Sequence, residues 1–221
     1  MSILQGWGEF VVAILVFLAS HSLPVRPRTR GALVARLGTT GFTLAYSAIS
    51  LAALGWLIVA TRRAPVIPLW DWAPWQNHVT YAAMALACVI AALAIGRPNP
   101  LSFGGAHNNR FDPAAPGIVG WVRHPLLVAL LLWSLGHLLP NGQLAPVLLF
   151  ALFAGFSLLG MRMIDRRRQR QLGRAEWRRL AGGPRRLDVT RAGLLRTAAG
   201  LATYAGLIAL HGPVIGVAPA F

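Results

Sequence analysis

Three histidines lie within or at the ends of apolar segments, where ionisable side chains are costly and therefore suggest a function. His21 ends the first apolar run, His124 opens the fourth run in the sequence Arg-His-Pro, and His137 lies near the end of that run. Neutral imidazole ligates iron, copper or zinc, and two imidazoles from different helices can hold a haem iron between them. The sequence places no further Cys, Asp or Glu near these positions to complete a tetrahedral zinc site. The residues therefore favour haem over zinc. The simpler alternative is that each histidine only pairs with a backbone carbonyl or a lipid phosphate.

The other titratable candidates are less suited to a buried centre. His78, His107 and His211 lie at the ends of apolar runs or in a long loop, so we expect them to be solvated or interfacial. Glu9 lies inside the first run and stays a candidate on the same ground as the three histidines. The single cysteine, Cys88, excludes an internal disulfide and a cysteine-based metal cluster, and its apolar surroundings indicate a small core residue.

The composition of the chain indicates which elements must position these side chains. Of 221 residues, 56% are hydrophobic and 12% are charged, whereas soluble domains carry about 25% charged residues. This excludes a disordered chain, a secreted disulfide scaffold and an ordinary cytosolic enzyme. Backbone polar groups in lipid must be satisfied within each segment, so apolar runs of roughly 20 residues form helices. We predict an all-α, polytopic transmembrane helical bundle with about six spans: Trp7–Leu23, Gly41–Ala60, Val79–Gly96, Ile118–Leu139, Leu144–Met161 and Leu194–Val217.

These spans are expected to form a single membrane domain over residues 1–221. Its core covers residues 3–161, a basic segment follows at 162–193, and the last span covers 194–217. The alanine-rich third span suits a central position. Small residues at Ala198, Ala202 and Gly206 would let the last span approach a neighbouring helix closely.

The arginines predict the orientation in the membrane. All 21 basic residues are arginine, and 19 of them lie in the loops after the first, third and fifth spans or, for Arg123 and Arg196, near the start of the span that follows. Positively charged loops stay on the cytoplasmic side. We therefore expect a multi-pass protein of the bacterial inner (plasma) membrane, with the odd-numbered loops cytoplasmic and both termini periplasmic. Trp70, Trp72 and Trp75 would then form an aromatic belt at the outer interface.

The basic segment is expected to lie on the membrane surface. Residues Asp165–Leu180 are compatible with a helix, which Gly182-Gly183-Pro184 would end. The arginines from Arg162 to Arg196 would bind anionic lipid headgroups. Nucleic acid is not an expected partner, because Trp177 is the lone aromatic residue among these arginines.

Several motifs resemble the NnrU family of bacterial inner-membrane proteins. They are Phe17-Leu-Ala-Ser-His-Ser-Leu23, Arg36-Leu-Gly38, Tyr46-Ser47, Val122-Arg-His-Pro125, Leu132-Trp-Ser-Leu-Gly-His-Leu-Leu139 and Asn141-Gly142. The resemblance extends from the first to the fifth span. It implies an accessory role in denitrification, linked to the production of nitrite reductase and nitric oxide reductase, with denitrification proteins as partners.

The same fold family includes the plant and cyanobacterial 15-cis-zeta-carotene isomerases, which carry haem b between histidines. This resemblance implies that His21 and His137 are the axial ligands of a haem b, with His124 as a further key histidine. Arg123 and His124 would hold a haem propionate or lie beside the pocket. The isomerases have a cysteine three residues before the second ligand, where this chain has Ser134, so polyene cis–trans isomerisation is only an alternative activity.

The spacing of the histidines leaves the ligand pair open. Thirteen residues separate His124 from His137, which corresponds to about 19.5 Å along a helix. His21 lies at the cytoplasmic end of its span, at the depth of His124. Either the first span reaches deeper, or the fourth span is broken, or His21 pairs with His124.

A second resemblance points to a different chemistry. Gly120-Trp-Val-Arg-His-Pro-Leu-Leu-Val128, with Leu172-Gly-Arg-Ala-Glu-Trp177 downstream, is similar to membrane methyltransferases that act on isoprenylcysteine or phospholipids. In that class the Arg-His-Pro motif helps to hold S-adenosylmethionine. The tyrosine expected two residues after the proline is Leu127 here, and the expected paired glutamates are missing. The first interpretation is therefore a haem-associated accessory factor, and the alternative is a membrane methyltransferase. A scaffold without enzymatic activity is a further alternative.

Overall fold

The computed structural model describes residues 3–186 and 189–219, with the side chains of residues 3–5 left out. These residues form helices joined by loops, with an isolated bridge between Pro68 and Gln143 and no strand among them. The contacts divide the chain into two compact units. The first comprises the chain up to Trp70 together with Gln143–Leu149, and the second comprises Asp71–Gly142 and the chain from Phe150 onward.

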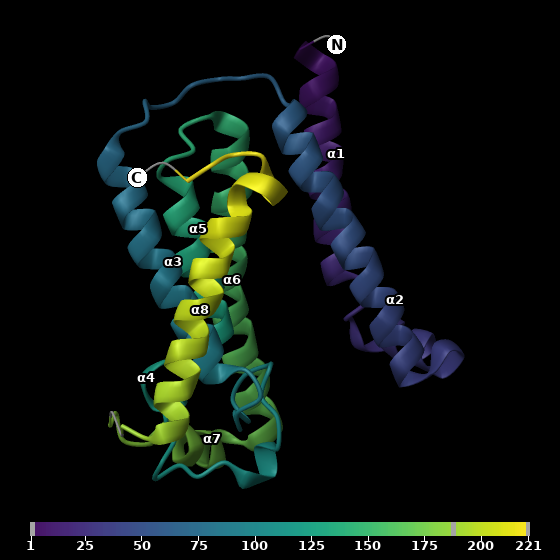
Figure 1. The fold of residues 1–221 in the computed structure, drawn as a ribbon. Helices are drawn as coiled ribbons and strands as arrows, with labels where there is room; N and C mark the ends of the chain where they lie inside the picture. The colour runs from purple at the N-terminus through teal and green to yellow at the C-terminus, as the bar shows by residue number, and fades with distance from the viewer. Residues whose placement is uncertain (1–2, 187–188, 220–221) are drawn as a thin grey trace. The chain divides into compact units, whose positions relative to one another are not determined.

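The first unit contains a pair of helices, α1 (Ile3–Ser22) and α2 (Pro27–Arg63), which pack against each other (Figure 1). Pro27 suits the first turn of α2, because the amide that proline lacks has no partner there. Gly38 interrupts the helical geometry of α2 with a φ of 71°, which glycine adopts without strain. The carboxylate of Glu9 accepts hydrogen bonds from Trp56 Nε1 and Arg63 Nη1, both at 3.3 Å. Glu9 therefore ties the two helices together.

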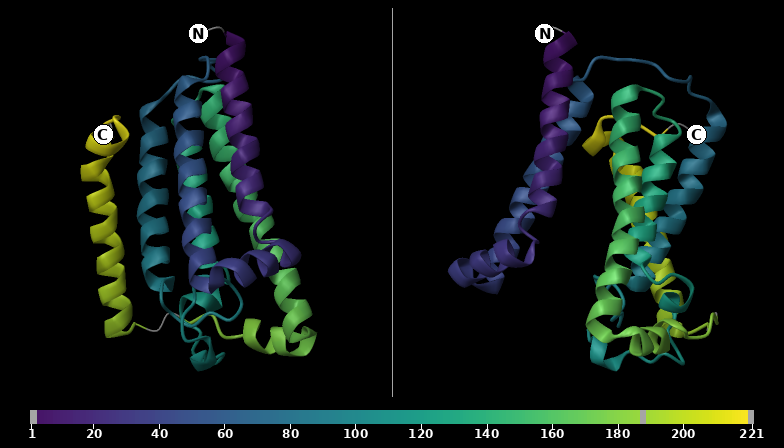
Figure 2. Two further views of the ribbon diagram at one scale, coloured as in Figure 1. Left: turned by 90° about the vertical axis from the view of Figure 1, so that its right-hand side faces the viewer. Right: turned by 180° about the vertical axis from the view of Figure 1, so that it is seen from behind.

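The second unit is built around α3 (Pro74–Ala94), which packs against both α5 (Pro125–Leu138) and α8 (Arg191–Ile215). This confirms the predicted central position of the alanine-rich segment. The part of α6 (Leu144–Leu172) from Phe150 onward also belongs to this unit. Two short helices, α4 (Ile118–Trp121) and α7 (Arg174–Ala181), lie at one end of the unit with the 3-10 turn η1 (Asn108–Arg110) (Figure 1). The same arrangement is seen from the side and from behind in Figure 2.

The contact between α3 and α8 depends on Gly200. This residue is buried, and a Cβ atom there would lie 2.8 Å from Val89 Cα and 2.9 Å from the carbonyl oxygen of Cys88. Ala198 and Ala202 are exposed, and no heavy atom lies within 4 Å of a Cβ built on Gly206. The close contact with α3 is therefore made at Gly200, about half a helical turn away from the face of Ala198, Ala202 and Gly206 for which close approach was predicted.

Four helices are long and apolar enough to cross a membrane: α2, α3, α6 and α8. Two shorter apolar helices, α1 and α5, accompany them. Together they describe a multi-pass membrane protein whose helices contain most of each predicted span. In the first unit α2 begins at Pro27, well before the predicted Gly41, and the second unit shows two further differences.

The first difference is that the predicted fourth span, Ile118–Leu139, is two helices. They are separated at Val122–His124, because proline disfavours helical geometry in the residue before it and cannot donate a hydrogen bond. The second difference is that α6 continues past Met161 to Leu172. Gly173, with a φ of 79°, then separates it from α7, which ends at Ala181 before the predicted Gly182-Gly183-Pro184 break.

Candidate functional site

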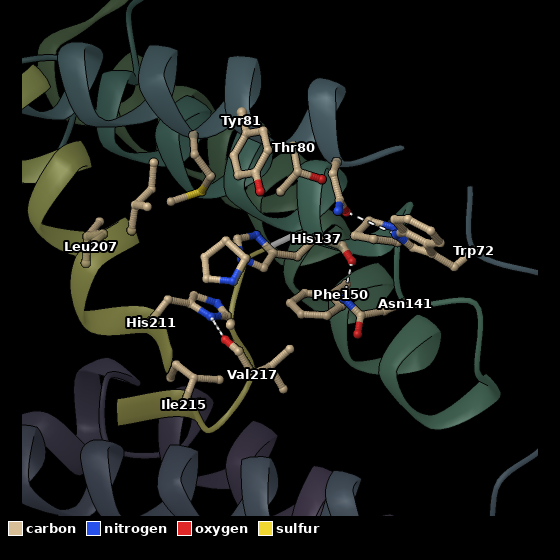
Figure 3. Close-up of a pocket in the computed structure, with 16 residues that line it drawn as sticks. Trp72, Thr80, Tyr81, His137, Asn141, Phe150, Leu207, His211, Ile215 and Val217 are labelled. Atoms are coloured by element: carbon tan, nitrogen blue, oxygen red, sulfur yellow. Dashed lines mark hydrogen bonds between the residues drawn. The ribbon is translucent and has the colours of Figure 1, made fainter. Parts of the chain in front are cut away.

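His137, in the last turn of α5, lines a cavity of about 360 Å³ formed by α3, α5, α8 and the loops at one end of the second unit (Figure 3). This volume is within the range of small-molecule and cofactor sites, which begins near 300 Å³. The wall is mainly apolar and aromatic, with a few polar groups placed between. The lining residues are Trp72, Asn77, Thr80, Tyr81, Met84, His137, Pro140, Asn141, Phe150, Leu207, Ile208, His211, Ile215, Val217, Ala218 and Pro219.

The imidazole of His137 is held in one orientation by its neighbours. Its Nδ1 lies 2.9 Å from the carbonyl oxygen of Trp133, four residues earlier on α5. Its ring packs against Trp133 and Phe150, with ring centroids 5.4 and 5.5 Å away. Because a carbonyl oxygen can only accept a hydrogen bond, Nδ1 must carry the proton. The Nε2 atom of the neutral ring therefore holds the free electron pair, which is the arrangement that metal-ligating histidines adopt.

His211 on α8 faces the same cavity in a similar state. Its Nδ1 lies 2.6 Å from the carbonyl oxygen of Val217, which again leaves the electron pair on Nε2. The ring centroids of His137 and His211 are 6.4 Å apart, with 24° between the ring planes (Figure 3). Sequence reasoning missed this residue because it treated His211 as interfacial. The signal was available, since both histidines lie near the carboxyl ends of their spans and the predicted topology puts those ends on the same side.

Hydrogen bonds from polar side chains connect the helices around His137. Thr80 Oγ1 donates to the carbonyl oxygen of Gly136 at 2.7 Å and joins α3 to α5. Asn141 Nδ2 donates to the carbonyl oxygen of His137 at 2.7 Å and closes the end of α5. Ser134, which replaces the cysteine of the isomerases, is fully buried and donates to the carbonyl oxygen of Leu130 at 2.7 Å. Its hydroxyl is thus engaged within the helix.

Arg123 and His124 belong to a second polar cluster at the other end of α5. Arg123 donates through Nε and Nη2 to both carboxylate oxygens of Asp165 on α6, at 2.9 and 2.7 Å. His124 Nε2 lies 3.0 Å from the same carboxylate, and its Nδ1 lies 3.0 Å from Ser102 Oγ. Charge-assisted bonds of this paired type are both directional and strong. Asp165 therefore anchors the Arg-His-Pro motif to α6.

His124 and Ser102 are almost completely buried, at 4% and 3% exposure. Burial lowers the pKa of the His124 imidazole below its ordinary 6.5, and the nearby Asp165 opposes this effect. A neutral ring fits both contacts, because Nε2 donates to the carboxylate while Nδ1 accepts from the hydroxyl. The serine, histidine and aspartate resemble a hydrolase triad in their contacts, but neither Ser102 nor His124 lines a described cavity. The contacts of His124 thus join the loop that contains Ser102 to Asp165 on α6.

The cluster also limits what the Arg-His-Pro motif can offer a ligand. The guanidinium of Arg123 lies over the ring of Trp177 on α7, 5.1 Å from its centroid, in addition to its bonds with Asp165. The carboxylate of Asp165 is shared between Arg123 and His124. A methyltransferase needs a carboxylate or an aromatic face for the sulfonium of S-adenosylmethionine, and here these groups are already occupied by the chain itself.

His21 lies on α1, in the first unit. Its Nδ1 lies 2.8 Å from the carbonyl oxygen of Phe17, four residues earlier, and 3.1 Å from Ser20 Oγ. Its ring packs on Phe17 at 4.1 Å between centroids and contacts Tyr46 on α2 at 6.3 Å. The local arrangement repeats that of His137, with Nδ1 next to the carbonyl of the previous helical turn.

The second unit holds four of the candidate residues at two places, and the first unit holds His21. His137 lies in the cavity with His211, Arg123 and His124 lie in the cluster with Asp165, and His21 lies in the first unit. Because α5 is an unbroken helix from Pro125 to Leu138, His124 and His137 are about 19.5 Å apart along its axis. The alternative of a break inside the fourth span between these histidines is excluded. Within the described residues, no group of three or more His, Cys, Asp or Glu could hold a metal ion.

Comparison with protein families gives one match. The model of the family described as NnrU protein matches residues 9–219 of the chain. The chain belongs to the NnrU family. A comparison with curated proteins and with solved structures found no match. The matched residues include parts of both structural units and extend beyond the fifth predicted span into the last helix.

Proposed function

We propose that this NnrU protein is a haem-associated accessory factor of the bacterial inner membrane that acts in denitrification, in the production of nitrite reductase and nitric oxide reductase. The observation that carries the haem proposal is the state of His137. Its Nδ1 is fixed on a backbone carbonyl and its ring lines a cavity with apolar and aromatic walls. The denitrification role rests on the family to which the chain belongs.

The residues of the cavity fit the group that is proposed to bind there. Haem iron takes imidazole as an axial ligand, and the protein tunes it through hydrogen bonds to the other ring nitrogen and through the apolar surroundings. The hydrogen bond from His137 Nδ1 to the carbonyl oxygen of Trp133 provides the contact to the other ring nitrogen. Tyr81 and Phe150 are among the aromatic residues that line the cavity. When bound, a haem would supply one-electron chemistry or the binding of a diatomic gas.

Two residues compete for the second axial position. His21 follows from the resemblance to the isomerases, and its Nδ1 lies next to the Phe17 carbonyl in the manner of His137. His211 follows from its place in the cavity, where its ring centroid is 6.4 Å from that of His137. We propose His21 and His137 as the pair, with His211 as the competing ligand in the absence of His21.

Optical spectra of the solubilised protein test the haem proposal. Expressed with an adequate haem supply, the wild type is expected to show a Soret band that shifts on reduction. His137→Ala should lose the band or convert it to a weak, five-coordinate spectrum, because the fixed ligand is gone. His21→Ala and His211→Ala then identify the second ligand, since only removal of a true ligand changes the low-spin signature.

His78→Ala is the matched control for these variants. His78 lies on α3, near the end of the helix that borders the cavity, but its side chain is exposed and does not line the cavity. Its spectrum should equal that of the wild type. A colourless wild type, or a His137→Ala variant with an unchanged spectrum, would overturn the haem proposal.

The accessory role is tested separately in cells. Deletion of the gene should lower nitrite reductase and nitric oxide reductase activities during denitrifying growth, and the wild-type gene should restore them. Restoration by His137→Ala to the same level would separate the physiological role from the haem. Unchanged reductase activities in the deletion strain would contradict a role in denitrification.

A further inference from the structure

A second cavity lies at the other end of α3 and is dominated by arginines. It has a volume of about 330 Å³ and lies where α3 ends, α4 begins and α8 begins. Four arginines are among the lining residues, against a single acidic residue, Asp112, and they come from three separate parts of the chain: Arg97, Arg110, Arg186 and Arg196. None of the ion pairs found among the described residues includes any of these four arginines. The cavity therefore carries a large excess of positive charge that the described part of the chain leaves uncompensated.

The walls of this cavity are held in place by specific contacts. Trp121 on α4 donates from Nε1 to the carbonyl oxygen of Arg186 at 3.2 Å. Gly120 permits a close approach of the same segment, because a Cβ atom there would lie 2.7 Å from the carbonyl oxygen of Pro184. Arg196 donates from Nη1 to the carbonyl oxygens of Ala92 and Ile95, at 2.9 and 2.7 Å. These bonds cap the carboxyl end of α3 and fix one guanidinium at the cavity.

The amino end of α8 adds to the same electrostatic field. Thr190 and Gly193 line the cavity, and Thr190 Oγ1 caps the helix by accepting from the amide of Gly193 at 3.0 Å. A helix amino terminus carries a partial positive charge that favours anions. The amino end of this 25-residue helix therefore adds to the positive potential that the arginines create at the cavity.

The number of donors distinguishes between classes of anion. A carboxylate has two oxygens, which one or two guanidinium groups satisfy. A phosphate has more oxygens and a higher charge, and arginine forks match its geometry. Four arginines around one cavity correspond to the larger anion. The apolar part of the wall, which includes Leu93, Ile118 and Val119, would accommodate a group attached to the phosphate.

We propose that this cavity is a binding site for a phosphate-class anion, held by Arg97, Arg110, Arg186 and Arg196. The site is more specific than the general attraction of the basic segment for anionic lipid, because Arg97 and Arg110 lie outside that segment in the sequence. It is independent of the haem proposal. The phosphate comes either from a lipid headgroup or from a free phosphate, and the two sources differ in what the apolar wall contributes.

Binding measurements on the full chain in an uncharged detergent test the site. The probes are inorganic phosphate, dihexanoylphosphatidic acid and, as a neutral-headgroup control, dihexanoylphosphatidylcholine, each titrated by thermal shift and calorimetry. Phosphatidic acid that binds at least tenfold more tightly than inorganic phosphate identifies a lipid headgroup as the source. Equal affinities identify a free phosphate.

Matched charge variants locate the binding. Arg97→Gln/Arg110→Gln should weaken the bound anion at least tenfold, because charge-assisted hydrogen bonds are lost. Arg170→Gln/Arg178→Gln removes the same charge from exposed residues that do not line the cavity and should change the affinity less than twofold. Arg186→Gln alone provides the same test if the first pair fails to fold.

Three outcomes would overturn the proposal. One is that neither phosphate nor phosphatidic acid binds to the wild type. Another is an equal loss of affinity in the two charge-matched pairs, which would indicate general electrostatic attraction. The third is that phosphatidylcholine binds as tightly as phosphatidic acid, which would make the anion irrelevant.

Discussion

At the scale of single residues, the same contact recurs at three histidines. His21, His137 and His211 each place Nδ1 within 2.9 Å of a backbone carbonyl oxygen. In a membrane this contact has two uses, because it satisfies the imidazole and it directs the electron pair of Nε2 outward. His124 differs, since both of its ring nitrogens contact polar side chains in a buried cluster. His124 thus connects separate segments of the chain, whereas the backbone contacts of the other three histidines lie within six residues of each ring.

The structural role of His124 predicts a dependence of stability on pH. Burial lowers its pKa in the folded protein, while the unfolded chain titrates near the ordinary 6.5. The unfolded state therefore takes up more protons as the pH falls. The stabilising contribution is complete above pH 6.5 and is lost as the pH falls through the lower pKa of the folded protein. The melting temperature of the wild type should accordingly decrease between pH 7.5 and pH 5.

The variant His124→Gln isolates this contribution. It should be less stable than the wild type at pH 7.5, and its melting temperature should change less with pH, because the titrating group is absent. The measurement is a series of thermal unfolding curves of both proteins in the same detergent. Parallel curves of melting temperature against pH for the two proteins would show that another group is responsible.

At the scale of the elements, the sequence predicted the helices and turns that depend on local patterns. It did not predict the features that depend on contacts between helices. The apolar runs predicted the helices, and Gly182-Gly183-Pro184 predicted the end of α7. The Arg-His-Pro motif lies within a run that is apolar on either side of it, so hydropathy alone did not reveal the break before Pro125. The packing face of α8 was also missed, because small residues are common on several of its faces and only the position of α3 selects Gly200.

The close contact at Gly200 predicts a large effect of a small change. Gly200→Ala adds a methyl group within 3 Å of the backbone of α3, so the two helices must separate, at a cost of about 1–3 kcal/mol of unfolding free energy. Gly206→Ala adds the same group on the same helix, where no heavy atom lies within 4 Å. The control should be neutral or slightly more stable, because alanine favours helix over glycine.

Denaturant unfolding of both alanine variants, followed by circular dichroism, compares them directly. The expected result is a lower midpoint for Gly200→Ala alone. Equal midpoints for the two variants would mean that α8 is not packed on α3 as closely as the structure places it.

At the scale of the whole molecule, helix length and arginine distribution describe how the chain lies in a membrane. α5 has 14 residues and spans about 21 Å, which is less than the roughly 30 Å of a hydrocarbon core. It begins directly after the polar cluster of Arg123, His124 and Asp165. The cavity proposed for haem and the cavity proposed for an anion thus lie at opposite ends of α3, and the second cavity is the one lined by four arginines.

The positive-inside rule predicts that the arginine-rich end faces the cytoplasm. Single cysteines introduced into a Cys88→Ser background test this orientation with a membrane-impermeant maleimide. Val66, in the loop after α2, and Val189, in the loop before α8, are both strongly exposed at 69% and 81%, so reactivity will report the side of the membrane. Val66→Cys should be labelled in spheroplasts, and Val189→Cys only after the membrane is permeabilised. The reverse pattern would contradict the positive-inside assignment. Each proposed site would then lie on the side of the membrane opposite to the one assigned here.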